Sequence, residues 1–129
     1  MIVTYQSAQV PYVWDRVKPF IQKALDRGSN YSTDDILEGL CNQSMQLWTW
    51  QDPELKAAMV TTIQTRDDVQ FCLFLVMGGE ALEDWIGFLP NIENWARHKG
   101  CQEMRIYGRA GWAKRTGYDI KYTKMVKEL

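Results

Sequence analysis

The chain has 129 residues, of which 46% are hydrophobic, and its 15 Lys and Arg against 16 Asp and Glu give a formal net charge of -1. A chain of this length and composition can bury a core without metal or disulfide support, so we expect a single domain over residues 1–129. No long block of one sign interrupts the sequence, which argues against a nucleic-acid or membrane partner.

The three cysteines, Cys41, Cys72 and Cys101, form no Cys-x-x-Cys pair and are odd in number. Disulfide and zinc frameworks are both disfavoured, so we expect no metal, a reducing compartment, and cysteines that fill core space. The first residues lack the basic segment and apolar run of a signal peptide, and no uncharged apolar stretch reaches membrane-spanning length. We expect a soluble protein of the cytoplasm, which includes the cytoplasm of an infected host.

The first third of the chain predicts a short strand and two helices. Residues 1–5 prefer the β conformation. Over residues 13–25, apolar side chains recur at three- and four-residue spacing, which indicates an amphipathic helix closed by Gly28, with Pro19 as a possible kink. Ser32 followed by Asp34 and Asp35 is a helix-start signature, so a second helix should run to about Asn42.

Three strands should follow. Residues 45–50 alternate in polarity, residues 55–65 are rich in β-branched side chains, and residues 69–77 form a nearly continuous apolar run. Such a run is typical of a central strand covered on both faces. The turn Arg66-Asp67-Asp68 makes the last two strands antiparallel.

The remaining elements complete one architecture. Gly78 and Gly79 are predicted to open a third helix, broken or kinked at Pro90 and ended by Gly100. A strand over 103–107, a compact turn at 108–112 with a short helix, and an alternating strand over 118–126 come last. The order β-α-α-β-β-β-α-β-α-β predicts an α/β (α+β) fold, a mixed and mostly antiparallel sheet flanked by helices.

This order resembles the GCN5-related N-acetyltransferase (GNAT) fold from end to end, with the helix end Trp95-Ala96, the turn at 108–112 and Gly117-Tyr118 at matching places. Within that superfamily the chain most resembles small phage-encoded members. Three motifs carry this narrower resemblance: Trp95-Ala96, Gly108-Arg109-Ala110-Gly111-Trp112 and Lys127-Glu128-Leu129. The resemblance implies a virion component, or a factor that engages a phage or host protein.

The resemblance also implies where a cofactor would lie. GNAT enzymes hold coenzyme A where the fourth and fifth strands separate, and its pyrophosphate rests on a glycine-containing loop at the start of the third helix. Such a loop attracts anions because its helix amides are unpaired and its glycines let the backbone come close. If acetyl-CoA binds here, the expected contacts are Val76, Met77, Gly78, Gly79 and Ala81. The family's Arg/Gln and its glycine spacing are absent.

Charge argues against tight binding at that loop. No basic residue stands between Arg66 and Arg97, whereas Glu80, Glu83 and Asp84 fall in the expected first turn of the third helix. Each carboxylate would repel a phosphate at about 4 Å by about 1 to 4 kcal/mol, which is comparable to what a helix terminus offers. We therefore expect a degenerate acetyl-CoA site and no required cofactor. Distant basic side chains that would have to compensate are Arg109, Lys114 and Arg115.

No residue can be assigned a catalytic role. Residues 109–116 contain no Tyr, Ser or Cys to protonate a leaving thiolate, and Tyr118 fits core packing better than an acid role. His98 stands between Arg97 and Lys99, as expected for a solvated residue in the last turn of a helix rather than for a general base.

The tryptophans leave two interpretations open. Trp48 and Trp50 share one face of a strand and are either an exposed strip for a partner or part of the core, whereas Trp85 and Trp95 have the helical spacing of core residues. The function also stays open between two classes. One is a non-catalytic protein-interaction component on a GNAT scaffold; the other is an acetyl-CoA-dependent N-acyltransferase that acts on an amine.

Overall fold

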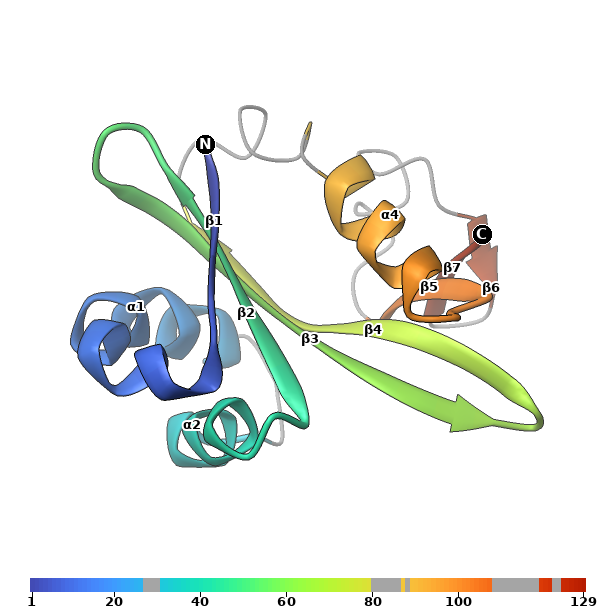
Figure 1. The fold of residues 1–129 in the computed structure, drawn as a ribbon, viewed down its shortest axis with the longest axis horizontal. Coiled ribbons are helices and arrows are strands. Elements are labelled where there is room, and N and C mark those ends of the chain that lie inside the picture. Colours follow the sequence, from blue (N-terminus) through green and yellow to red (C-terminus); the bar gives the residue numbers. More distant parts are fainter. Residues whose placement is uncertain (27–30, 80–86, 88, 108–118, 122–123) are drawn as a thin grey trace. The chain divides into compact units, whose positions relative to one another are not determined.

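The computed structural model describes residues 1–26, 31–79, 87, 89–107, 119–121 and 124–129. Its strands form one sheet in the order β1-β2-β3-β4-β5-β7-β6 (Figure 1). The described elements are β1 (Ile2–Tyr5), the 3-10 turn η1 (Ser7–Gln9), α1 (Val10–Leu25), α2 (Thr33–Cys41), β2 (Met45–Gln51), β3 (Leu55–Arg66), β4 (Val69–Gly79), α4 (Leu89–His98), β5 (Glu103–Tyr107), β6 (Asp119–Lys121) and β7 (Lys124–Glu128).

The sheet is mixed and mostly antiparallel, as the sequence predicts. Strand β1 pairs antiparallel with β2, β7 pairs antiparallel with both β5 and β6, and β4 pairs in parallel with β5. The chain divides into two compact units: unit 1 contains Met1–Thr61 and Val76–Trp85, and unit 2 contains Thr62–Leu75 and Ile86–Leu129. The single domain stays a prediction. Among the described residues, no helix has the length and apolar character needed to cross a membrane.

The two helices of unit 1 form where the sequence places them. Helix α1 turns one apolar stripe inward, and Pro11 stands in its first turn, where a missing N–H costs nothing. Pro19 lies within α1 without ending it. The Ser32 hydroxyl accepts from the Asp35 N–H at 3.1 Å, and the Asp35 carboxylate accepts from the Ser32 N–H at 2.9 Å. This reciprocal cap starts α2 at Thr33, and the expected closure of α1 by Gly28 lies outside the described residues.

Strands β2 and β3 of unit 1 are covered on both faces at their centres. Leu47 is buried on the side of β2 that carries Met45, the residue that approaches Gly39 of α2, and Trp48 points to the opposite face and is also buried. The Trp48 indole N–H donates to the Thr61 hydroxyl at 3.0 Å, and this hydroxyl donates to the Gln46 side-chain carbonyl at 2.8 Å. A chain of hydrogen bonds therefore links β2 to β3 inside unit 1.

Unit 2 begins with a tight hairpin. The loop between β3 and β4 has two residues, Asp67 and Asp68, and both have positive φ, at 54° and 64°. A two-residue hairpin turn of this kind requires positive φ at both central positions, which Asp tolerates better than most residues. The predicted turn at Arg66-Asp67-Asp68 is confirmed.

Gln70 connects the start of β4 to the segment that leads into β5. Its side-chain amide donates to the Lys99 carbonyl at 2.9 Å, and its backbone N–H donates to the Gln102 side-chain carbonyl at 3.2 Å. The Gln102 N–H in turn donates to the Gln70 carbonyl at 2.8 Å. These bonds fix the parallel register in which Phe71–Phe74 face Glu103–Ile106.

Helix α4 ends as the sequence predicts. Gly100 has a φ of +88°, and the Cys101 N–H donates to the Ala96 carbonyl at 3.0 Å. At the other end, Pro90 stands in the first turn of α4, because the helix begins at Leu89. The apolar stripe predicted to begin at Leu82 lies partly outside the described residues, as does the predicted short helix within 109–116.

The last strand is predicted wrongly. The expected single strand over 118–126 is two antiparallel strands, β6 and β7, and Lys121 of β6 pairs with Lys124 of β7. Alternation in polarity continues through both strands, so it does not mark the break, and residues 122–123 are Tyr and Thr rather than turn formers.

The Trp48–Thr61–Gln46 chain yields a stability test. Replacing Thr61 by Val keeps the shape of the side chain but removes both hydrogen bonds, and we expect the free energy of unfolding in urea to fall by about 1 to 3 kcal/mol. Thr65→Val, at an exposed position on the same strand, is the control and should change it by less than about 0.5 kcal/mol. Equal effects of the two substitutions would show that the buried hydrogen bonds among Trp48, Thr61 and Gln46 do not stabilise unit 1.

Candidate functional site

The residues expected to contact a cofactor lie at the end of β4. Val76 and Gly78 are buried, Met77 is half-buried and Gly79 is exposed, and all four belong to the strand. The prediction that Gly78 and Gly79 open a helix is therefore wrong for these two residues. The fifth expected contact, Ala81, and the three carboxylates of residues 80, 83 and 84 lie outside the described residues.

The glycine pair permits close packing within unit 1. A Cβ added to Gly78 would stand 2.5 Å from the Phe20 carbonyl oxygen and 3.1 Å from the Ala24 Cβ, both on α1. A Cβ added to Gly79 would stand 2.5 Å from the Lys56 carbonyl oxygen on β3, and its φ of +155° is one that L side chains rarely adopt. Neither glycine can carry a side chain without displacing backbone atoms of a neighbouring element.

This packing bears on whether the chain fits a pyrophosphate. A phosphate cradle needs glycines that leave open space beside unpaired amides at the start of a helix. Here the space beside Gly78 is filled by α1 and the space beside Gly79 by β3. The described residues therefore do not provide such a cradle, and the glycines have a packing role that accounts for their presence.

His98, which was considered as a general base, has a position that needs no catalytic explanation. His98 is exposed in the last turn of α4, next to the exposed Arg97 and Lys99. It has the solvated, dipole-stabilised position that its spacing predicts. Tyr118 and residues 109–116 lie outside the described residues.

Two of the three cysteines are buried, as expected. Burial raises the pKa of the Cys101 thiol, although a hydrogen bond with Gln70 partly offsets this effect, and Cys72 is fully buried. Cys41 is exposed at the last position of α2, so the prediction that it fills core space is wrong. Side chains at the end of a helix are frequently exposed to solvent, and the residue type alone does not reveal that Cys41 lies at such a position.

The tryptophans on β2 belong to the core. Trp48 and Trp50 are 6% and 8% exposed, so the alternative of an exposed aromatic strip is excluded. Trp95 on α4 is half-buried, and Trp85 and Trp112 lie outside the described residues. A partner surface on unit 1 must therefore be sought elsewhere.

Unit 2 contains a buried charge pair that no motif in the sequence indicates. Arg105 of β5 is 6% exposed, its Nε stands 2.8 Å from the Glu103 carboxylate, and its guanidinium carbon lies 3.8 Å from the centroid of the Phe71 ring. A second pair joins α4 to β7, where Lys127 Nζ stands 2.8 Å from the buried Glu93 carboxylate. Because each charge has an opposite charge beside it, we assign both pairs a structural role.

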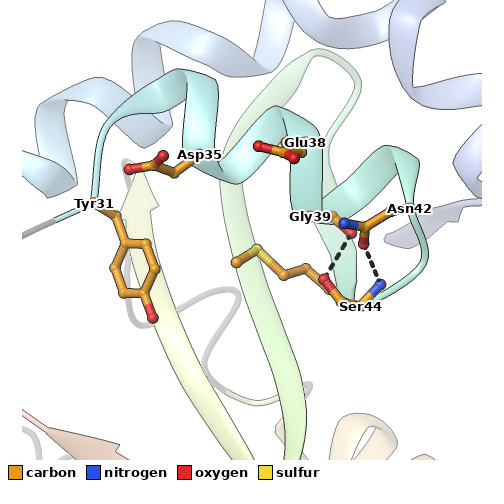
Figure 2. Close-up of a pocket in the computed structure, with 7 residues that line it drawn as sticks. Tyr31, Asp35, Glu38, Gly39, Asn42 and Ser44 are labelled. Atoms are coloured by element: carbon orange, nitrogen blue, oxygen red, sulfur yellow. Dashed lines mark hydrogen bonds between the residues drawn. The ribbon is translucent and has the colours of Figure 1, made fainter.

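A pocket of about 420 Å³ opens beside α2 in unit 1. Figure 2 shows Tyr31 at one end, Asn42 and Ser44 at the other, and Asp35 and Glu38 along the helix between them. Among the described residues, those that line the pocket are Tyr31, Asp35, Glu38, Gly39, Asn42, Ser44 and Met45. No sequence motif marks it, because its residues are typical of a helix surface.

Comparison with solved structures identifies the fold. The structure matches aminoglycoside 6'-acetyltransferase type Ii with a TM-score of 0.73 at 11% identity, over 99% of this chain and 96% of that one. It matches the PaiA N-acetyltransferase of Thermoplasma acidophilum, solved with coenzyme A, with a TM-score of 0.63 at 14% identity, over 100% and 98%. A GNAT acetyltransferase of Brucella melitensis, solved with acetyl-CoA, gives 0.67 at 12% identity, over 100% and 87%.

No protein-family model matches the chain, and no curated protein matches its sequence. The fold is nevertheless that of the GNAT acetyltransferases, and the similarity extends over nearly the whole of this chain. At these identities the likeness describes the architecture, and function has to be argued from the residues.

The packing role of the glycines can be tested directly. Gly78→Ala should lower the free energy of unfolding in urea by about 1 to 3 kcal/mol, because the new methyl group overlaps the Phe20 carbonyl. Gly87→Ala is the matched control, since an added Cβ at Gly87 would meet no described residue within 4 Å, and its effect should stay within about 0.5 kcal/mol. Full stability of the Gly78 variant would contradict the proposed close contact with α1.

Proposed function

We propose that this chain is a GNAT-fold protein with a degenerate acetyl-CoA site that acts by binding another protein. The observation that carries the proposal is the absence of any basic residue between Arg66 and Arg97, in the region that family resemblance assigns to the pyrophosphate. The packing of Gly78 and Gly79 against α1 and β3 supports it, since these glycines do not provide a phosphate cradle.

The charges that follow β4 oppose pyrophosphate binding however the glycines pack. A pyrophosphate carries several negative charges and needs cationic side chains or unpaired amides to replace its water. Glu80, Glu83 and Asp84 supply the opposite sign along the sequence that follows β4. Binding of coenzyme A there would have to overcome about 1 to 4 kcal/mol of repulsion for each carboxylate within about 4 Å.

The partner we propose is a phage or host protein. Support comes from the sequence resemblance to small phage-encoded GNAT-like proteins, carried by the motif at 108–112 and the ending Lys127-Glu128-Leu129. The protein would meet this partner in the cytoplasm of the host or as a component of the virion. Its surface charge, near balance overall, is not that of a nucleic-acid-binding or membrane-binding protein.

An acetyl-CoA-dependent N-acyltransferase acting on an amine is the second candidate. The similarity to acetyltransferase structures over nearly the full length of both chains favours it, and two of these structures hold coenzyme A or acetyl-CoA. In this function Val76 and Met77 would lie beside the cofactor arm, and Arg109, Lys114 and Arg115 would have to supply the missing positive charge.

Calorimetric titration with acetyl-CoA separates the two functions. We expect no saturable heat up to millimolar acetyl-CoA, because no basic residue stands between β4 and Arg97 to offset the carboxylates at positions 80, 83 and 84. The PaiA N-acetyltransferase of Thermoplasma acidophilum, which is known in complex with coenzyme A, serves as the positive control in the same buffer. Micromolar binding to this chain would overturn the proposed degenerate site and favour the second candidate, which acetyl transfer to an amine with release of free coenzyme A would then establish.

A charge reversal tests where the repulsion arises. Glu80→Arg should make acetyl-CoA binding measurable or strengthen it about tenfold, which corresponds to about 1.4 kcal/mol. Asp15→Arg, an equal change at an exposed position in the first half of α1, is the control and should have no effect. Identical titrations for the two variants would show that the pyrophosphate is not repelled at residue 80.

Recovery of the partner tests the binding function itself. The tagged protein, purified from infected cells or from particles, should retain a stoichiometric protein through washes that remove weakly bound material. If the protein is recovered alone and monomeric from both sources, the binding function is wrong even if acetyl-CoA does not bind.

A further inference from the structure

The pocket beside α2 lies in a part of the chain that carries only negative charge. No Lys, Arg or His stands between Arg27 and Lys56. The same stretch contains five carboxylates: Asp34, Asp35, Glu38, Asp52 and Glu54. Two of them, Asp35 and Glu38, line the pocket, and none of the described residues that line it is cationic.

The two carboxylates of the pocket differ in what they already bind. Asp35 accepts a hydrogen bond from the Ser32 N–H and so serves the start of α2. The exposed Glu38 carboxylate makes no hydrogen bond or ion pair with any residue that the structure describes. Glu38 therefore has full capacity for an incoming cation, whereas Asp35 has one oxygen in use.

The remaining walls suit a cation on an aliphatic stem. Tyr31, 40% exposed at one end of the pocket, offers an aromatic ring that attracts a cation to its face. Met45 contributes an apolar thioether, and it comes close to α2 because position 39 is glycine: an added Cβ there would stand 2.7 Å from Met45 Cγ. The pocket, of about 420 Å³, is broadly open to solvent, so a side chain on the surface of another protein can reach it.

We propose that this pocket receives a Lys or Arg side chain of the partner protein. The proposal rests on the protein-binding function proposed above and assigns its contact surface to unit 1. The Glu38 carboxylate would pair with the charged group, the Tyr31 ring would lie against it, and Met45 would contact the aliphatic stem. A metal ion is a poorer occupant, because the described residues contain no group of three or more side chains that could hold one.

The pocket can be probed with peptides of defined charge. The amide resonances of ¹⁵N-labelled protein are followed while a capped peptide, acetyl-Gly-Ser-Lys-Ser-Gly-amide, is added, and the same peptide with Glu in place of Lys serves as the charge control. We expect the Lys peptide to shift the amides of Gly39, Asn42 and Ser44 in a saturable manner that weakens with added salt. The Glu peptide should shift none of them.

A matched pair of variants assigns the contact to Glu38. Glu38→Gln should weaken binding of the Lys peptide about twofold to fivefold, as expected for one exposed ion pair. Glu54→Gln removes the same charge at an exposed position outside the pocket and should leave the affinity unchanged. Equal weakening by both variants, or equal shifts with the Lys and Glu peptides, would overturn the proposal.

The outcomes also distinguish this inference from the function on which it rests. If the wild type retains a partner and Glu38→Gln retains it equally well, the pocket is not the contact but the binding function stands. If neither protein retains a partner, the function fails, and the peptide titration still decides whether the pocket binds a cation. Self-association of the wild type that Glu38→Gln abolishes would make a second copy the occupant and contradict the proposed partner.

Discussion

At the end of β4, the backbone packs so closely against α1 and β3 that residues 78 and 79 have no room for a side chain. Gly78 brings the strand against the Phe20 carbonyl of α1, and Gly79 brings it against Lys56 and Ala57 of β3. Because cores are close-packed, an extra methyl group at either place would have to displace backbone rather than a mobile side chain. The arrangement of α1 on the sheet of unit 1 therefore requires small residues at this one point, and the neighbouring apolar contacts of α1 and β3 depend on it.

The same contact changes how the GNAT resemblance is understood. The resemblance suggests that glycines near the start of the third helix bind an anion, but glycines can also serve packing, and Gly78 and Gly79 of β4 do so here. What distinguishes the two roles is the charge nearby: carboxylates follow β4 in the sequence, and no basic residue occurs before Arg97. A scaffold can persist while its binding chemistry changes, because the core and the site depend on different residues.

Local signals in the sequence were sufficient for much of the fold. The Ser32–Asp35 cap, the turn at Asp67-Asp68 and the helix end at Gly100 were predicted because each requires particular residues over three or four positions. The break between β6 and β7 was not predicted, since the alternating pattern runs through it. Of the candidate site, the sequence named Val76 to Gly79 but assigned the glycines to a helix start instead of a strand.

The sequence by itself determined the order of the described α-helices and strands from β1 to β5, the parallel crossover into β5 and the distribution of charge, because these follow from periodicity, turn chemistry and the count of ionisable residues. Only the tertiary structure decided what the glycines of β4 touch, that Trp48 and Trp50 are buried, and that α2 borders a pocket lined by Asp35 and Glu38. These features depend on which surfaces meet when helices and strands pack, and no local pattern in the sequence specifies that.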